Sequence, residues 1–194
     1  MSTERHIALF GGTFDPVHLG HLDIATKARE ACDIDEVHFL PCRQSPHKKS
    51  APGASDSQRV EMLKIAIAGL PWARLNELEL QSPPPSYMWQ TLRQLRAQAN
   101  AATRFHLLIG LDQWQALPRW SRPDYLAAHL HFIVVGRDGH PEPRHGYEAS
   151  FLAGNHPASS SEIRRQLAAG EEPDWLPPAV RAYISAQQLY QIES

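Results

Sequence analysis

Two histidine side chains, His18 and His21, stand three residues apart where a helix is expected to begin. Residues three apart lie on one face of a helix, so both imidazoles can face the same ligand. Imidazole nitrogens donate hydrogen bonds to phosphoryl oxygens, and a protonated ring adds positive charge. The same spacing suits a metal ion, but two ligands are too few and no cysteine or carboxylate stands at an obvious third position. The pair therefore favours an anion contact over a metal site or a purely structural role.

The residues before the two histidines predict a strand, a glycine turn and the start of a helix, in that order. The apolar run 7–10 predicts a buried strand, and Gly11 and Gly12 end it. Glycines let backbone N–H groups approach a ligand closely, and the first turn of a helix carries unpaired N–H groups and a positive dipole end. This order predicts a phosphate-binding loop, although the loop has neither the P-loop lysine nor the G-x-G-x-x-G spacing.

The composition of the chain limits the class of protein that contains this loop. With 194 residues, of which 42% are hydrophobic and 21% charged, the chain suits one globular domain over residues 1–194. The formal net charge of -2 and the absence of a basic run argue against a nucleic-acid surface, so the phosphate site is local. There is no apolar stretch of the roughly 20 residues that would span a membrane. Two cysteines fit a reducing cytoplasm.

Apolar patterns over the rest of the chain alternate between strands and helices, which predicts parallel strands joined by helices. We expect a Rossmann-like, doubly wound α/β sheet with a small helical C-terminal appendage over about 159–194. The pair Ser55 and Gln58 predicts a capped helix that runs to Ala68, and Ser86 is a plausible N-cap of a later helix. The expected strands cover 7–10, 37–41, 75–80 (half-exposed or at an edge), 104–110 and 130–135, whereas 138–150 has the composition of a variable loop.

The segment GGTFDPVHLGH resembles the H-x-G-H signature of nucleotidyltransferases that transfer an α-phosphate. More narrowly it resembles the bacterial nicotinate-nucleotide adenylyltransferases, and the likeness extends over nearly the whole chain. The resemblance implies transfer of AMP from ATP to nicotinate mononucleotide, which gives deamido-NAD and pyrophosphate in NAD biosynthesis, with Mg²⁺ bound by the phosphates. It implies that His18 and His21 stabilise charge during the transfer. It also implies ATP contacts for the loop residues Gly11, Gly12, Thr13 and Phe14.

A second phosphate-binding stretch follows near the C-terminus. Ser159 and Glu162 have the spacing of a capping box, so a helix is expected to begin at Ser160. Taken alone, this stretch is typical of an ordinary capped surface helix. It resembles the family's I-S-[SA]-T-x-I-R segment, which implies that Ser160, Ser161 and Arg164 grip the β and γ phosphates of ATP, with Arg164 among the catalytic residues.

A polar loop follows the second expected strand. Its lysines by themselves suggest no more than solubility. The loop resembles the family's P-P-H-K/R motif, which implies a catalytic role for Lys48 and a substrate contact for His47. Ser45 replaces the first proline of the motif, and Cys42 stands where the family often has asparagine.

Residues 86–88 begin a helix whose N–H groups can bind a carboxylate. They resemble the family's S-Y-T segment, so Ser86, Tyr87 and Met88 are implied contacts of the nicotinate carboxylate, although Met88 lacks the threonine hydroxyl. A tryptophan beside a polar loop can stack on a flat ring or belong to the core. Family likeness places Trp120 beside the pyridine ring and leaves Trp114 to packing.

Two further contacts are expected at strand ends. Gly110 and Asp112 resemble the family's I-G-x-D, which implies a ribose or nucleotide contact, and Asp112 is also a credible helix N-cap. Arg137 resembles an arginine of the family at the end of a strand. It either reaches the nucleotide phosphate or base, or is simply exposed.

Other functions stay open on the sequence alone. A related adenylyltransferase that acts on nicotinamide mononucleotide or phosphopantetheine shares the H-x-G-H and serine–arginine stretches. A nucleotide-binding sensor without catalysis is the alternative outside enzymes. The partners expected are ATP and nicotinate mononucleotide, with no nucleic acid and no membrane, and the sequence leaves a homo-oligomer open.

Overall fold

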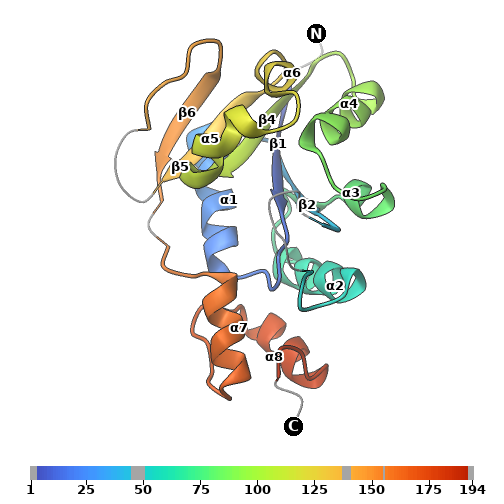
Figure 1. The fold of residues 1–194 in the computed structure, drawn as a ribbon, viewed down its shortest axis with the longest axis vertical. Coiled ribbons are helices and arrows are strands. Elements are labelled where there is room, and N and C mark those ends of the chain that lie inside the picture. The colour runs from blue at the N-terminus through green and yellow to red at the C-terminus, as the bar shows by residue number, and fades with distance from the viewer. Residues whose placement is uncertain (1–3, 45–50, 137–140, 155, 192–194) are drawn as a thin grey trace.

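The protein folds around one sheet of six parallel strands (Figure 1). The computed structural model describes residues 4–44, 51–136, 141–154 and 156–191. The strand order is β3-β2-β1-β4-β5-β6, so β1 lies inside the sheet between β2 and β4. The strands are β1 (Arg5–Gly12), β2 (Glu36–Pro41), β3 (Ala73–Leu75), β4 (Thr103–Gly110), β5 (His131–Gly136) and β6 (Glu148–Ala153).

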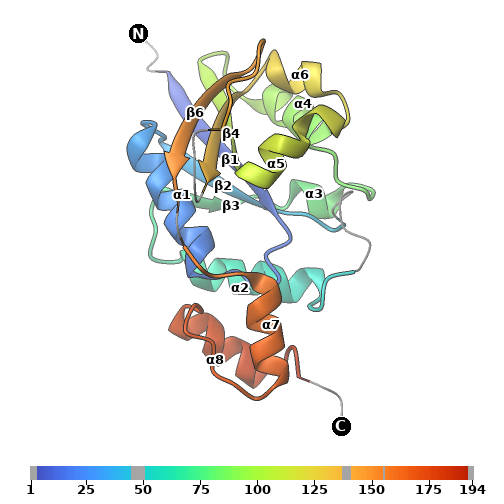
Figure 2. The same cartoon turned by 60° about the vertical axis from the view of Figure 1, so that its left-hand side comes forward.

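Helices cover both faces of this sheet, as the two rotated views show (Figures 1 and 2). They are α1 (Leu19–Ala31), α2 (Asp56–Ile67), α3 (Leu78–Gln81), α4 (Met88–Gln98), α5 (Leu111–Ala116), α6 (Pro123–Ala127), α7 (Ser160–Ala168) and α8 (Pro178–Ala186), with a 3-10 turn at Leu117–Arg119. The expected Rossmann-like, doubly wound sheet is therefore confirmed.

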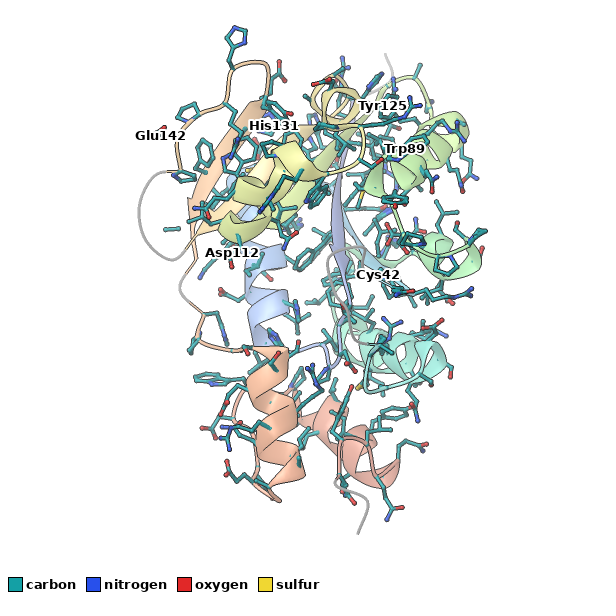
Figure 3. The ribbon with its side chains drawn as sticks, viewed as in Figure 1. Cys42, Trp89, Asp112, Tyr125, His131 and Glu142 are labelled. Carbon is teal, nitrogen blue, oxygen red and sulfur yellow. The ribbon has the colours of Figure 1, made fainter. Side chains whose placement is uncertain are left out.

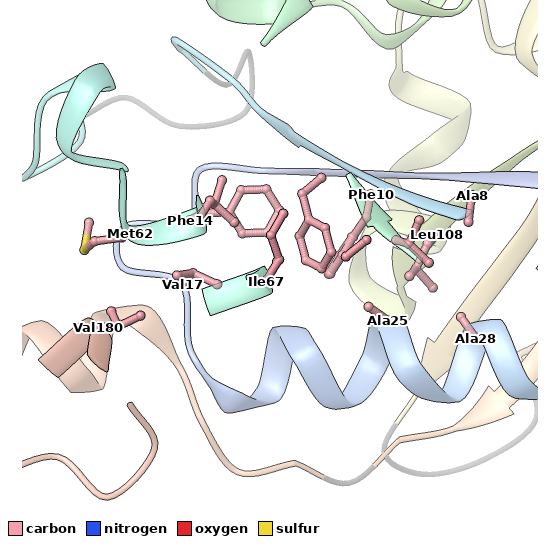
Figure 4. Close-up of a cluster of buried hydrophobic side chains, with 14 of the residues drawn as sticks. Ala8, Phe10, Phe14, Val17, Ala25, Ala28, Met62, Ile67, Leu108 and Val180 are labelled. Atoms are coloured by element: carbon pink, nitrogen blue, oxygen red, sulfur yellow. The ribbon is translucent and has the colours of Figure 1, made fainter. Parts of the chain in front are cut away.

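Side chains that alternate along β1 divide the core into two layers. Ala8 and Phe10 pack on the side of α1, where they meet Ala25 and Ala28 (Figure 4). The intervening residues of β1 point to the other side, where α4, α5 and α6 cover the sheet. Residues of α7 and α8 extend the first layer, so the C-terminal helices at the lower end of Figure 2 share its core with α1 and α2.

Local capping signals set the starts of two helices as expected. The Ser55 hydroxyl accepts a hydrogen bond from the Gln58 N–H, and the Gln58 side chain accepts one from the Ser55 N–H. Ser159 caps α7 by accepting a hydrogen bond from the Glu162 N–H at 3.2 Å. These bonds join residues three apart, so they form wherever the helix forms.

The prediction of a strand over 75–80 is wrong for most of that segment. The edge strand β3 ends at Leu75, and the next residues turn into the short helix α3. The Asn76 side chain accepts a hydrogen bond from the Leu78 N–H at 3.1 Å, which offers the backbone a turn in place of a ladder. The turn buries Glu79 and Leu80.

Two other local expectations are also corrected. The N-cap of α4 is Tyr87 and not Ser86, and Tyr87 makes no side-chain capping bond. The strand β6 includes residues 148–150, which the sequence places in a variable loop. This strand pairs with β5 at the edge of the sheet, and its side chains are only partly buried, so its apolar pattern is weak.

Candidate active site

A cavity of about 640 Å³ opens at the carboxyl ends of β1 and β4, between the starts of α1, α4 and α7. Ligands of parallel α/β sheets bind at this edge, where strand order reverses around the first strand. The cavity brings together most of the residues that the sequence singles out. Those that line it are Gly11, Gly12, Thr13, Phe14, His21, Ser86, Tyr87, Met88, Gly110, Trp120, Ser160 and Arg164.

The two histidines of the H-x-G-H segment stack against each other at the start of α1. Their ring centroids lie 3.7 Å apart at an interplanar angle of 27°. The backbone N–H of His18 donates a hydrogen bond to Nδ1 of the His21 ring at 3.2 Å. Nδ1 is therefore the acceptor, and in the neutral ring of His21 the proton is on Nε2. His21 lines the cavity, whereas His18 is only 6% exposed and lies outside its lining. The two rings lie side by side as expected, but only His21 lines the cavity, so contact of both rings with one ligand stays a prediction.

Burial controls the charge of this pair. Desolvation, with His156 as a nearby second imidazole, lowers the pKa of His18 to about 4. His18 is therefore neutral at pH 7 and adds no positive charge beside His21.

The glycine loop owes its shape to an aromatic ring beneath it. Phe14 is 1% exposed and has a positive φ of 49°. Its ring lies edge-on to His21, with centroids 5.0 Å apart. A Cβ atom at Gly12 would lie 2.9 Å from Cζ of Phe14, so only glycine fits above the ring. Phe14 is thus a support of the loop as well as part of the cavity wall.

A buried arginine that the sequence analysis missed also holds this loop. Arg59 is fully buried on α2, and its Nη1 donates to the Thr13 carbonyl oxygen at 2.6 Å. Its Nη2 donates to Asp56 at 2.6 Å. One feature of the sequence could have identified Arg59: it lies one turn before Leu63 on the apolar side of the helix. A charge without a partner is costly there, so the sequence predicts a partner for it.

Asp15 was likewise missed, because the sequence analysis includes it only as one residue of the GGTFDPVHLGH segment. The side chain is 4% exposed and accepts hydrogen bonds from the N–H groups of Gly53 and Ala54 and from the Tyr190 hydroxyl. A carboxylate beside a predicted phosphate site was the available signal, since it needs several donors to stay buried.

The start of α7 is bonded directly to the same loop. Arg164 donates from Nη1 to the Asp15 carbonyl oxygen at 2.6 Å, and Ser160 donates to the Pro16 carbonyl oxygen at 3.1 Å. Both side chains line the cavity. Ser161 is exposed and lies outside the lining. The structure therefore joins the two predicted phosphate-binding stretches, which are separated by more than a hundred residues, in one site.

The opposite wall of the cavity is formed by the start of α4 and by Trp120. Met88 reaches across to the glycine loop, where its Cε lies 3.3 Å from the position of a Cβ on Gly11. Beneath this wall the buried carboxyl of Glu79 accepts a hydrogen bond from the Thr91 hydroxyl at 2.9 Å. Burial raises the pKa of Glu79. The sequence analysis missed Glu79 because it placed this residue in a strand.

Several expected residues lie elsewhere. Asp112 is exposed on the first turn of α5, outside the cavity lining, and Gly110 rather than Asp112 is the N-cap of that helix (Figure 3). Trp114 is 1% exposed and packs edge-on against Phe132, which confirms its packing role. His47, Lys48 and Arg137 lie outside the described residues.

Cys42 follows β2 and lines the cavity (Figure 3). Its N–H donates to the Gly12 carbonyl oxygen at 3.0 Å, which extends the pairing of β1 and β2 by one bond. Neither Cys32 nor Cys42 forms a disulfide bond.

Across the described residues, no group of three or more His, Cys, Asp or Glu side chains could hold a metal ion. The cavity carboxylates Asp15 and Glu79 already accept hydrogen bonds from the protein. In the same part of the chain, no helix is long and apolar enough to cross a bilayer.

Comparison with known proteins defines the class to which this site belongs. Residues 9–166 match the model of the cytidylyltransferase-like family, so the chain belongs to that family. The chain is 38% identical to a protein of Gloeobacter violaceus named "Probable nicotinate-nucleotide adenylyltransferase", with 97% of each chain aligned. It is 33% identical to a protein of the same name from Cellvibrio japonicus, over 95% of this chain and 98% of the other. Within the family, the chain belongs with the nicotinate-nucleotide adenylyltransferases.

A solved structure confirms the fold independently. Nicotinic acid mononucleotide adenylyltransferase of Plasmodium falciparum, complexed with NaAD, superposes with a TM-score of 0.79 at 21% identity. The match covers 96% of this chain and 97% of the other.

Proposed function

We propose that the protein transfers AMP from ATP to nicotinate mononucleotide and releases pyrophosphate, giving deamido-NAD. The observation that carries the proposal is a single cavity with two kinds of wall. One wall holds the glycine loop, His21, Ser160 and Arg164, which suit a triphosphate. The other holds the start of α4 and Trp120, which suit a ring bearing a carboxylate. The full-length likeness to relatives that carry this name supports the same reaction.

In the proposed reaction, an oxygen of the acceptor phosphate attacks the α-phosphorus of ATP as the bond to pyrophosphate breaks. Such a transfer needs positioning and charge stabilisation more than covalent catalysis. Nε2–H of His21 donates to a phosphoryl oxygen, while neutral His18 holds the His21 ring in place from behind. Arg164 and Ser160 bind the outer phosphates at the start of α7. Lys48 is expected to add positive charge from the loop outside the described residues.

In this proposal, magnesium would be bound together with ATP. The phosphate oxygens of ATP would be the main ligands of the ion. The ion neutralises phosphate charge when bound. The chain's own part is to hold the phosphates with backbone N–H groups, His21 and Arg164.

The acceptor is held at the opposite wall. The first N–H groups of α4 have no partner within the helix and point toward its N-terminal end, where they can bind the nicotinate carboxylate. Trp120 lines the same cavity, and in this proposal its ring stacks on the pyridine. Met88 supplies a backbone N–H but no hydroxyl.

A pyrophosphate-release assay with ATP and three acceptors tests the proposal. We expect release to be fastest with nicotinate mononucleotide, and slower with nicotinamide mononucleotide or phosphopantetheine. Faster release with either of the other acceptors would reassign the substrate. Tight ATP binding without release on any acceptor would indicate a nucleotide sensor instead.

A further inference from the structure

The carboxylate of Asp15 joins three segments that are far apart in the sequence. Its Oδ2 accepts a hydrogen bond from the Gly53 N–H at 2.8 Å, and its Oδ1 accepts one from the Ala54 N–H at 3.0 Å. Oδ1 also accepts a hydrogen bond from the hydroxyl of Tyr190 at 2.8 Å, 175 residues further along the chain. The C-terminal segment is thereby tied to the phosphate-binding loop.

The same residue sets the position of a predicted phosphate ligand. Arg164 donates from Nη1 to the Asp15 carbonyl oxygen at 2.6 Å, and this nitrogen lies 3.7 Å from Oδ2 of the carboxylate. The guanidinium is therefore near the carboxylate without a direct hydrogen bond to it. It stays one-third exposed and lines the cavity.

Tyr190 is held in place by more than its hydroxyl. Its ring lies against Gly53, where a Cβ atom would approach Cε1 of the tyrosine to 3.2 Å. Its backbone φ is +63°, and that of Gln188 is +51°. Bulky residues rarely adopt this region, so the surrounding structure must hold the segment there. Burial and the Asp15 charge raise the pKa of Tyr190, so its hydroxyl stays a donor at neutral pH.

We propose that Tyr190 is a positioning residue for ATP binding, because its hydroxyl occupies Oδ1 of Asp15 and keeps that carboxylate from capturing Arg164. The proposal rests on the adenylyl transfer proposed above. Without the hydroxyl, Asp15 keeps its two backbone donors but gains an unsatisfied lone pair. Arg164, whose Nη1 lies 3.7 Å from the other carboxylate oxygen, Oδ2, is then attracted into a direct hydrogen bond with the carboxylate and away from the phosphates.

The test is Tyr190→Phe, which removes one oxygen atom and keeps the ring against Gly53. We expect kcat/KM for ATP to fall about tenfold or more, the size of one hydrogen bond to a charged group. KM for nicotinate mononucleotide is expected to stay within about twofold, because the acceptor wall is not touched. Tyr183→Phe is the matched control: Tyr183 packs on the same core layer, and among the described residues its hydroxyl makes no hydrogen bond to the loop.

A second measurement needs no turnover. In calorimetric titrations well below the melting temperature of the least stable variant, Tyr190→Phe is expected to bind a nonhydrolysable ATP mimic about tenfold more weakly than the Tyr183→Phe control. A lower melting temperature with unchanged binding of the mimic and unchanged kinetics would show a purely structural hydroxyl and overturn the proposal. A wild-type protein that fails to adenylylate nicotinate mononucleotide would refute the function instead, and the titration would still decide the role of Tyr190.

Discussion

The His18 ring is stacked on the His21 ring with centroids 3.7 Å apart, and only His21 lines the cavity. Two positively charged imidazoles at this distance would repel each other, and burial keeps His18 neutral. The two residues of the H-x-G-H segment therefore divide the work. His21 faces the cavity in which we propose that the phosphates bind, and His18 contacts the ring of His21 through its backbone N–H and its stacked face.

His21→Ala is expected to lower turnover at least about 100-fold, since one donor to developing charge is lost. ATP binding should persist, because the glycine loop, Ser160 and Arg164 are unchanged. Steady-state kinetics and a titration with an ATP mimic check both parts. His145→Ala, on an exposed loop, is the control. Near-normal turnover in His21→Ala would remove this ring from the mechanism.

Gly12→Ala is expected to destabilise the protein by about 1–3 kcal/mol, because its methyl group would meet the buried Phe14 ring at 2.9 Å. Phe14 is packed on the core and on His21, so its displacement should lower activity as well. Denaturant unfolding and kinetics measure both. Gly69→Ala is the control, since nothing lies within 4 Å of a Cβ at that position. Equal stability of the two variants would contradict the tight fit.

Arg59→Met is expected to cost about 1–3 kcal/mol of stability, because the Thr13 carbonyl oxygen loses a buried donor. The loop should also bind ATP more weakly, which raises KM for ATP. Arg165→Met is the control: its pair with Glu162 is exposed, and such pairs contribute little. Chemical denaturation of both variants measures the difference, and a loss as small as that of the control would show that Arg59 does not support the loop.

Acid should destabilise the protein through buried histidines. His106 is 8% exposed, its Nε2 lies 3.0 Å from Nδ1 of His6, and its ring lies 5.4 Å from that of His131. Burial, with these two rings, lowers the pKa of His106 from 6.5 to about 4. The unfolded chain therefore binds the proton first as pH falls. The contribution of neutral His106 to the stability of the folded protein is complete above pH 6.5 and is lost progressively as the pH falls toward 4.

Replacement of this ring should flatten the pH profile. Below pH 6.5, His106→Leu is expected to reduce the slope of unfolding free energy against pH by up to about 1.4 kcal/mol per unit, the effect of one proton. Melting curves between pH 4.5 and 7.5 measure the slope, with His145→Leu as the exposed control. An unchanged slope in His106→Leu would mean that this ring titrates normally in the folded state.

Met88→Thr introduces a hydroxyl at the start of α4, where the family's S-Y-T segment has a threonine. We expect it to favour nicotinate over nicotinamide mononucleotide by about tenfold, as one hydrogen bond to a carboxylate would. Met88→Leu keeps an apolar side chain and should leave the ratio unchanged. The ratio of kcat/KM for the two acceptors is the measurement. The same ratio in all three proteins would show that the backbone donors alone select the acceptor.

Short-range features of this protein could be predicted from its sequence. The capped starts of α2 and α7 depend on side chains three residues from the backbone groups that they bind. The buried parts of β1 and β4 are mostly apolar, because both faces of the sheet are covered. The errors occurred where local signals are ambiguous. The stretch after Asn76 alternates apolar and polar residues like a strand, but the Asn76 side chain bonds the Leu78 N–H and the chain forms a helix. The apolar pattern of the half-exposed strand β6 was too weak to predict a strand.

The sequence by itself determined the phosphate loop, the H-x-G-H pair and the serine–arginine stretch, because their chemistry is written in consecutive residues. The tertiary structure decided how they act together. It placed Arg164 and Tyr190 on Asp15, buried Arg59 beneath Thr13, and turned His21 rather than His18 toward the cavity. These contacts join segments from 46 to 175 residues apart, and burial fixes their charges. Both depend on the packed chain, which no local pattern records.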